Sequence, residues 1–211
     1  MNLAYPIIVL VVASILTVLV IHVELTSSVI LTGKGGQTYT LNNGYITLYL
    51  NMNTTRITPG ETIRITALMY YNGNQPIVVN AVDVHVPLPY PCIVPLMIGV
   101  NIFKGYYTNA TISKGTPLQL IKPGVYDCPA VFTDEQYMLI PHSYQLQVIC
   151  QSNVIEQVGN DFSINVRGYW IPNNSTFPFP SGNFTEFQPG VYTVQLVDYF
   201  NQSLLAYFTI G

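Results

Sequence analysis

The stretch Thr62-Ile63-Arg64-Ile65-Thr66-Ala67-Leu68-Met69 decides the fold class of this 211-residue chain. Its apolar residues at positions 63, 65, 67 and 69 alternate with Thr62, Arg64 and Thr66. Because successive side chains of a strand point to opposite faces, a period of two indicates a strand with one buried face. The stretch therefore predicts an antiparallel strand that covers a core.

The same alternation returns along the chain after Gly44, where no window has a convincing helical period. Gly, Pro and Asn separate the alternating runs, as in antiparallel sheets. We expect an all-β fold, an antiparallel β-sandwich over residues 45–211, with one N-terminal hydrophobic helix before it. A division of the sandwich into two subdomains stays open. The expected strands include residues 38–41, 46–50, 82–86, 144–150, 162–166, 192–196 and 205–210.

Three Pro-Gly turns punctuate the chain, and each is expected to begin a strand. They are Thr58-Pro59-Gly60-Glu61, Lys122-Pro123-Gly124-Val125-Tyr126 and Gln188-Pro189-Gly190-Val191-Tyr192. Pro at the second position and Gly at the third predict a type II turn, in which the Gly takes a positive φ. The last two turns share Pro-Gly-Val-Tyr. We interpret this as the same type of turn used twice within one sandwich. The alternative is two tandem sandwich units.

Residues 3–23 form an apolar run with no acidic or basic side chain before His22, and all seven Lys and Arg follow it. A helix of this length crosses a hydrocarbon core of about 30 Å. Residues 1–28 are therefore an uncleaved membrane anchor or a cleaved signal; the absence of a basic start counts against a signal. Either alternative places the rest of the chain at the cell surface or outside the cell.

Residues 29–44 contain glycine-rich stretches, so we expect a flexible tail there that acts as a donor strand. In an assembly, this tail would fill the sheet of another copy and bury its apolar side chains in that copy's core. The expected contact residues are Val29, Ile30, Leu31, Tyr39 and Leu41.

Charged residues make up 8% of the chain, against roughly 25% in ordinary soluble domains. The net charge is −3, so we expect no electrostatic steering by either sign. Lys and Arg are scattered singly, which excludes nucleic acid as a partner. A surface built from Asn, Thr, Gln, Ser and Tyr suits an exported protein of a hot or acidic habitat, because few ion pairs are lost when carboxylates protonate.

Three cysteines permit one disulfide and one free thiol in an oxidising exterior. Cys92 and Cys128 each adjoin a proline in loop-like sequence, and we favour a bridge between them. A Cys128–Cys150 bridge across neighbouring strands stays open. Cys150 ends an alternating run, so it is otherwise expected to face the core as a small hydrophobe.

Two parts of the chain resemble immunoglobulin-like surface domains. Residues 58–65 followed by Asn72-Gly73-Asn74 look like the early strands, and residues 187–194 followed by Tyr207-Phe208-Thr209-Ile210 look like the last two. The low-charge, Tyr- and Asn-rich style is similar to exported proteins of thermoacidophilic archaea. Among these the chain resembles, in architecture, the pilus-like subunits of archaeal thread filaments. This resemblance implies an immunoglobulin-like β-sandwich, glycosylation, and a sheet completed by the tail of the neighbouring subunit.

Six N-x-[ST] sequons are candidate glycosylation sites. Two of them overlap, so only one of that pair is expected to be used. The sequons stand at Asn53, Asn109, Asn173, Asn174, Asn183 and Asn201.

The aromatic and proline-rich residues 169–180 contain the only tryptophan, Trp170. An exposed cluster of this kind is typical of a contact patch for a neighbouring subunit or a sugar. Alternatively, it caps one open end of the sandwich.

No catalytic or metal-binding pattern is recognisable. His22, His85 and His142 lack the spacing to a Cys and a Met that blue copper requires, and the carboxylates are dispersed. No nucleophile elbow, P-loop or dinucleotide fingerprint occurs. We therefore expect no enzyme and no cofactor.

The expected function is structural: a subunit of an extracellular filament or of the cell envelope. Its expected partners are copies of itself or other envelope proteins, with the membrane as a further partner through residues 3–23 if that segment stays. The alternative is a membrane-anchored monomeric surface domain that binds a sugar or an envelope partner through Trp170.

Overall fold

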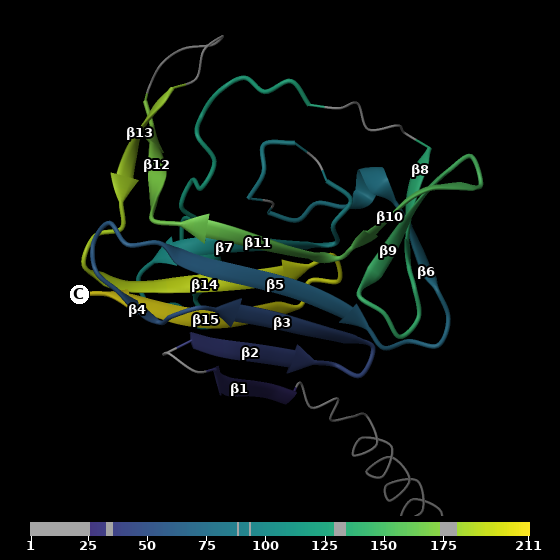
Figure 1. The fold of residues 1–211 in the computed structure, drawn as a ribbon, viewed down its shortest axis with the longest axis horizontal. Helices are drawn as coiled ribbons and strands as arrows, with labels where there is room; N and C mark the ends of the chain where they lie inside the picture. Colours follow the sequence, from purple (N-terminus) through teal and green to yellow (C-terminus); the bar gives the residue numbers. More distant parts are fainter. Residues whose placement is uncertain (1–25, 33–35, 88, 93, 129–133, 174–180) are drawn as a thin grey trace, which may run out of the picture.

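The computed structural model describes residues 26–32, 36–87, 89–92, 94–128, 134–173 and 181–211 (Figure 1). The expected N-terminal helix over residues 3–23 lies outside these ranges, and so do Asn174 and residues 177–180. Within them, the regular structure is β-strands and two short 3-10 helices, η1 (Ala81–Asp83) and η2 (Ile112–Lys114). The predicted all-β class is thereby confirmed.

The first sheet contains the alternating stretch at residues 63–69. Its strand order is β1-β2-β3-β5-β11, and every neighbouring pair is antiparallel. Along β5, residues 63, 65, 67, 69 and 71 are buried and those between them are more exposed, as the alternation predicts. The strands are β1 (Thr26–Thr32), β2 (Gly36–Asn42), β3 (Ile46–Met52), β5 (Ile63–Tyr71) and β11 (Asp161–Val166).

The second sheet has the order β4-β15-β14-β7. Its central pair, β14 and β15, is an antiparallel hairpin, whereas β4 runs parallel to the last residues of β15. The strands are β4 (Arg56–Ile57), β7 (Ile98–Lys104), β14 (Gly190–Asp198) and β15 (Ser203–Ile210).

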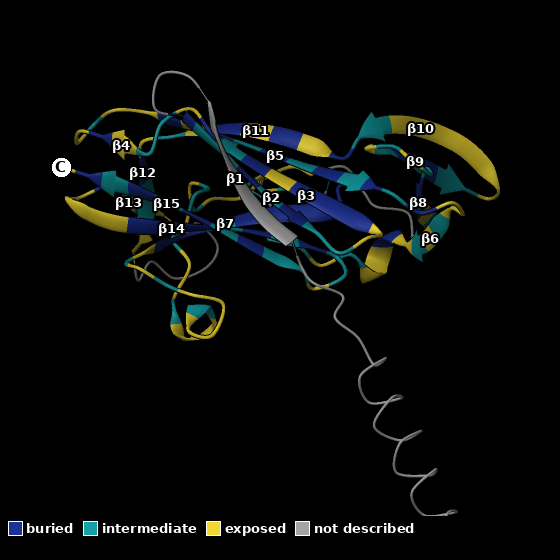
Figure 2. Cartoon of the chain, turned by 90° about the horizontal axis from the view of Figure 1, so that it is seen from below, coloured by how far each residue is buried: buried dark blue, intermediate teal, exposed yellow. Residues whose placement is uncertain are grey.

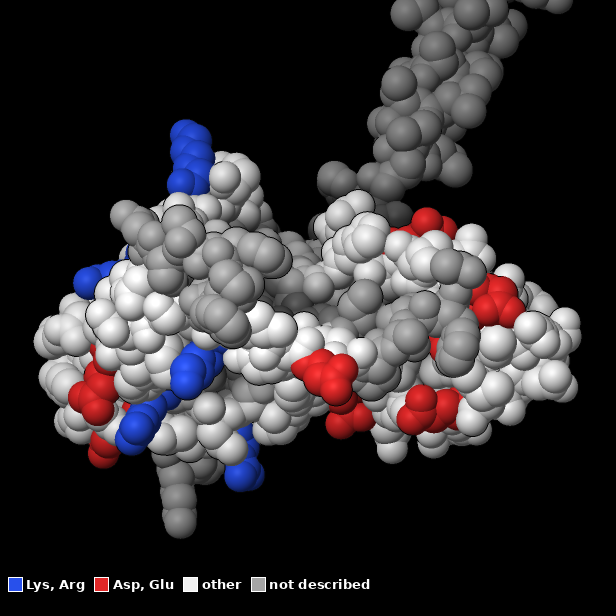
Figure 3. All heavy atoms as spheres, turned by 90° about the horizontal axis from the view of Figure 1, so that it is seen from above, with Lys and Arg blue, Asp and Glu red and all other residues white. Residues whose placement is uncertain are grey.

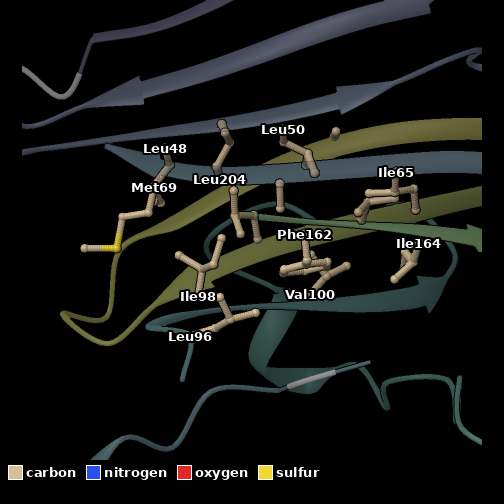
Figure 4. Close-up of a cluster of buried hydrophobic side chains, with 14 of the residues drawn as sticks. Leu48, Leu50, Ile65, Met69, Leu96, Ile98, Val100, Phe162, Ile164 and Leu204 are labelled. Atoms are coloured by element: carbon tan, nitrogen blue, oxygen red, sulfur yellow. The ribbon is translucent and has the colours of Figure 1, made fainter. Parts of the chain in front are cut away.

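These two sheets face each other, and their apolar faces form the core between them (Figure 4). Strand β15 lies against β2 and β3, and β7 lies against β5. Leu48 and Leu50 from the first sheet and Leu204 from the second are at most 5% exposed. Burying such side chains contributes roughly 25 cal/mol per Å² of apolar surface removed from water, so this contact is the main source of stability.

A third sheet and a separate hairpin lie at opposite ends of the long axis (Figures 1 and 2). The third sheet has the order β10-β9-β8-β6, and its inner residues Tyr137, Leu139, Leu146 and Val148 join the same core cluster. The remaining strands are β6 (Ile77–Asn80), β8 (Glu135–Leu139), β9 (Gln145–Cys150), β10 (Asn153–Gly159), and the hairpin β12 (Gly168–Pro172) and β13 (Gly182–Glu186).

The strand expected over residues 82–86 does not form. Residues 81–83 make η1 instead, and Val82 is 47% exposed, so the Val alternation does not follow a buried face. The amide of Asn80 bonds the Asp83 carboxylate, and the Val84 N–H donates to Ala81 O, which closes this turn. Local hydrogen bonding therefore outweighs the strand preference of the valines.

The three Pro-Gly turns differ in conformation. The first is closed by a Glu61 N–H to Thr58 O bond and has Gly60 at φ +85, as expected for type II. Gly190 has φ +139 and directly begins β14, so it does not fit type II. The second turn is not followed by a strand among residues 124–128. Val125, the first residue after its glycine, is 73% exposed and pairs with no sheet.

Candidate interaction surfaces

Residues 29–32 and 36–42 belong to the chain's own first sheet. Strand β1 pairs with β2 in register over all seven residues of each, and β2 continues the sheet beside β3. One short turn connects β2 to β3, in which Asn43 Oδ1 accepts the N–H of Tyr45 and of Ile46 and Gly44 takes φ +90. The folded region therefore extends to the N-terminal side of Tyr45, the expected start of the sandwich.

Strand β2 places two of the expected contact residues in the core. Tyr39 is 9% exposed and Leu41 is 7% exposed, on the face of β2 that meets β15. Burial raises the pKa of the Tyr39 hydroxyl, and a hydrogen bond with the Tyr207 backbone opposes that rise. The other three expected contact residues, Val29, Ile30 and Leu31, lie in β1, whose backbone pairs with β2.

Strand β15 has a partly open outer edge. Strand β4 pairs only with Thr209 and Ile210, so residues 203–208 have no second strand partner among the described residues. Beside this edge is a hollow of about 340 Å³, lined by residues that include Leu41, Asn109 and Tyr207. On this side, β2 and the segment at Tyr106 and Tyr107, which contacts Tyr207, lie against β15.

An aromatic and basic groove lies beside the β12–β13 hairpin. Its volume is about 480 Å³. Trp170 on β12 and Phe184 on the opposite position of β13 meet edge to face, with ring centroids 5.4 Å apart. At Gly168 a Cβ would come within 2.1 Å of Thr185 O, so the close approach of the two strands requires glycine there. The groove is lined by Thr62, Leu120, Asn165, Val166, Arg167, Gly168, Trp170 and Phe184.

Cations border this groove. The Arg167 guanidinium lies 5.4 Å from the Phe184 ring centroid, and Lys122 Nζ lies 5.7 Å from that of Trp170. Each is within the range of a cation–π interaction. Arg64 Nε donates to Asn165 Oδ1 over 3.3 Å. The groove therefore presents apolar rings and positive charge together, a combination suited to an apolar ligand that carries a carboxylate.

Trp170 was expected as a contact residue, but its neighbours were not. In the sequence, Lys122 and Arg167 stand as single scattered charges, and Phe184 lies outside the aromatic and proline-rich residues 169–180. The available signal was the aromatic residue at the centre of each of the segments 168–172 and 182–186, because antiparallel pairing of these segments places Trp170 directly opposite Phe184. The aromatic residues at positions 177 and 179 that drew attention to this segment lie outside the described part.

Cys92 and Cys128 form a disulfide, with Cα atoms 5.3 Å apart, and this is the pairing that the sequence analysis favoured. Cys150 is a free thiol at the end of β9 and is only half-buried. Partial burial and the nearby Asp134 carboxylate raise the pKa of this thiol, which keeps it protonated and poorly nucleophilic.

The sequon asparagines in the described part are all exposed: Asn53, Asn109, Asn173, Asn183 and Asn201. Asn183 and Phe184 are neighbours on β13 and point to opposite faces of the hairpin. A glycan on Asn183 would therefore leave the groove open.

The described residues contain no cluster of three or more His, Cys, Asp or Glu that could hold a metal ion. His85 and His142 are exposed. His142 takes φ +53 and its Nε2 lies 2.9 Å from Asn74 Oδ1, in a contact between two loops.

No known protein family, curated protein or solved structure matches this chain. Its function must therefore be argued from its own surfaces.

Proposed function

We propose that the chain is a structural subunit of an extracellular filament or envelope layer, in which copies assemble through β-strand contacts. The observation that carries this proposal is the place of the β1–β2 hairpin. It forms the edge of the first sheet, it contributes Tyr39 and Leu41 to the core, and only the turn at residues 42–45 connects it to β3.

A hairpin with these properties is suited to exchange between copies. The backbone bonds between β2 and β3 are the same whether β2 comes from the same chain or from a neighbour. If the turn opens, the tail of one copy fills the sheet of the next, and each copy keeps a vacant edge for another. Such a head-to-tail contact does not close, so it propagates as a fibre.

The architecture we propose for the subunit is an immunoglobulin-like sandwich. Tyr192 supports it: this residue lies near the start of β14, is fully buried, donates its hydroxyl to Gln188 O over 2.9 Å, and accepts the Gln188 N–H. A tyrosine that bonds the backbone four residues upstream at the start of a strand is typical of these sandwiches. The Tyr126 hydroxyl donates in the same way to Lys122 O, which explains the repeated Pro-Gly-Val-Tyr.

Two further features support a place outside the cell. The Cys92–Cys128 disulfide suits an oxidising compartment, and the five described sequon asparagines are accessible for glycans. Glycans would solubilise a surface on which charged residues are few.

The test is a disulfide that reports which chain supplies β2. Thr40 and Tyr49 are directly opposite each other in the β2–β3 pair, so Thr40→Cys and Tyr49→Cys are introduced in a Cys150→Ser background. We expect oxidised, assembled material to give a ladder of covalent multimers on a non-reducing gel. The control pair Gln195→Cys and Leu205→Cys, opposite in β14–β15, should close within single chains.

Covalent monomers from both cysteine pairs, in material that is visibly assembled, would exclude strand exchange. Protein that never assembles at any concentration would exclude the filament itself.

A second candidate function is a monomeric surface domain that binds a sugar. The aromatic pair Trp170 and Phe184 favours it, because sugars stack on aromatic rings. A full-length protein that remains monomeric and binds a glycan array through Trp170 would select this candidate over the first.

A further inference from the structure

The few charges of this chain are divided between its two ends. No Lys or Arg occurs between residues 65 and 103 or between residues 123 and 166. The third sheet and its loops fall within these two segments, so this end has acidic side chains and no Lys or Arg among the described residues. On the face shown in Figure 3, the Lys and Arg atoms lie on one half of the molecule and most Asp and Glu atoms on the other.

The acidic end carries a protruding hairpin, β9–β10 (Figure 2). Strand β10 pairs only with β9 among the described strands, so its outer edge is open. Val154 and Ile155 are 55% and 54% exposed, and Glu156 beside them is exposed too. The strand register shifts between Val154 and Glu156, which leaves Ile155 as the extra residue of a bulge. Bulges of this kind re-aim side chains at sheet edges.

Adjacent exposed apolar side chains on an open strand edge promote aggregation unless a partner surface covers them. The groove beside β12–β13, at the opposite end of the long axis, has the complementary chemistry. It offers the rings of Trp170 and Phe184 to apolar side chains, and Arg167 and Lys122 to a carboxylate.

Two acids of the same end of the molecule, Glu61 and Glu186, are directed at a neighbouring turn. Glu61 accepts the N–H of Thr58, and the Glu186 carboxylate lies against Gly60, so both face the turn at residues 58–61. The cations also cover one face of each ring, which leaves less ring surface for stacking on a neutral sugar.

We propose that the β9–β10 hairpin of one copy docks into the Trp170 groove of the next. Val154 and Ile155 pack against Trp170 and Phe184, and Glu156 faces Arg167 and Lys122. Because the two surfaces lie at opposite ends of one molecule, the contact is head-to-tail and repeats along a line. The inference rests on the proposed assembly of copies, but it is independent of strand exchange.

The test uses two full-length variants, each lacking one of the two surfaces. Variant one carries Val154→Ser and Ile155→Ser, and variant two carries Arg167→Glu and Phe184→Ser. Both variants carry Cys150→Ser and the Thr40→Cys and Tyr49→Cys pair, closed as a disulfide within single chains before assembly, so that strand exchange cannot extend them. In this background we expect neither variant to form long chains alone. Mixed together, they should form a dimer that cannot extend, because one hairpin and one groove stay intact. Sedimentation or light scattering gives the masses, and the dimer should weaken several-fold as salt screens the charges.

The control is Val78→Ser with Val82→Ser, which removes two valines of the same end that are each 47% exposed. It should assemble as the unaltered chain does. A charge exchange gives a second test: Glu156→Arg and Arg167→Glu should each weaken association at least about tenfold, and a mixture of the two variants should restore it.

Unchanged assembly of both surface variants, with a ladder from the β2–β3 cysteines, would overturn this contact and leave strand exchange standing. If the unaltered chain stays monomeric, both the hairpin–groove contact and strand exchange are excluded. Binding of a sugar at Trp170 without any mixed dimer would assign the groove to the second candidate function and reject the docking of the hairpin.

Discussion

Asp198 is a buried carboxylate whose ionisation affects the stability of this molecule. It is 3% exposed at the end of β14, where its two carboxylate oxygens accept the backbone N–H and the side-chain Nε2 of Gln202. Burial raises its pKa from 3.8 to about 6 in spite of these bonds. The neighbouring Gln202 Oε1 is buried without a hydrogen-bond partner, and a protonated carboxyl can donate to it if the amide turns.

A raised carboxyl pKa makes the folded state bind the proton more tightly than the unfolded state does. Stability from Asp198 is therefore fully present below pH 3.8 and is lost as the pH rises through about 6. The difference corresponds to about 3 kcal/mol, or roughly 6–12 °C in melting temperature for a chain of this size. We expect the melting temperature to rise when the pH is lowered from 7.5 to 4.

Asp198→Asn should raise the melting temperature at pH 7.5 and remove most of this pH dependence, because the neutral amide resembles the protonated carboxyl. The matched control is Asp127→Asn, an exposed site. A variant that keeps the full pH dependence would assign it to other groups.

At the scale of elements, the turn of the β9–β10 hairpin is strained. Gln151 and Ser152 form a two-residue connection between the paired residues Cys150 and Asn153, with φ values of +50 and +67. Such a turn requires positive φ at both positions, for which Asn-Gly is the favoured sequence. Gln151→Asn with Ser152→Gly should therefore increase the free energy of unfolding by about 1 kcal/mol.

Chemical denaturation measures this change, and Gln151→Val provides the opposite control, since a β-branched residue disfavours positive φ. If Asn-Gly destabilises the hairpin, its conformation is not the one described. Because the turn leaves Val154 and Ile155 in place, the stabilised variant should still assemble.

How far the sequence predicts each element depends on whether one face of that element is buried. Strand β5 follows its alternation because every second residue packs into the core. Residues 82–86 alternate equally well, but Val82 is exposed and only Val84 of the three valines packs against the core, and a local turn forms instead. The β12–β13 hairpin is not among the expected strands, because the aromatic residues and prolines between its two strands obscure the short strands on either side.

At the scale of the whole molecule, net charge was a poor guide to electrostatics. The value of −3 led us to expect no steering, but the distribution along the sequence separates the signs between the two ends once the chain is folded. The gaps in Lys and Arg were visible beforehand. Their meaning depends on tertiary structure, because β6 comes from the first of these segments and β8, β9 and β10 from the second, and only folding brings them together in one sheet.

The Cys92–Cys128 disulfide joins two segments without regular secondary structure. The two cysteines are 36 residues apart in the sequence. Closing a loop of this length removes conformational freedom from the unfolded chain and is worth about 4 kcal/mol. We expect Cys92→Ala with Cys128→Ala to lower the free energy of unfolding by that amount, and a reducing agent to lower that of the unaltered chain equally. Chemical denaturation with and without the reductant measures both.

Cys150→Ser is the control that separates this bridge from the Cys128–Cys150 alternative. Cys150 is half-buried and free, so its replacement should cost less than about 1 kcal/mol and should leave the effect of the reductant unchanged. If Cys150→Ser abolished the effect of the reductant, the stabilising bridge would have to include Cys150, and the packing at the end of β9 would differ from that described.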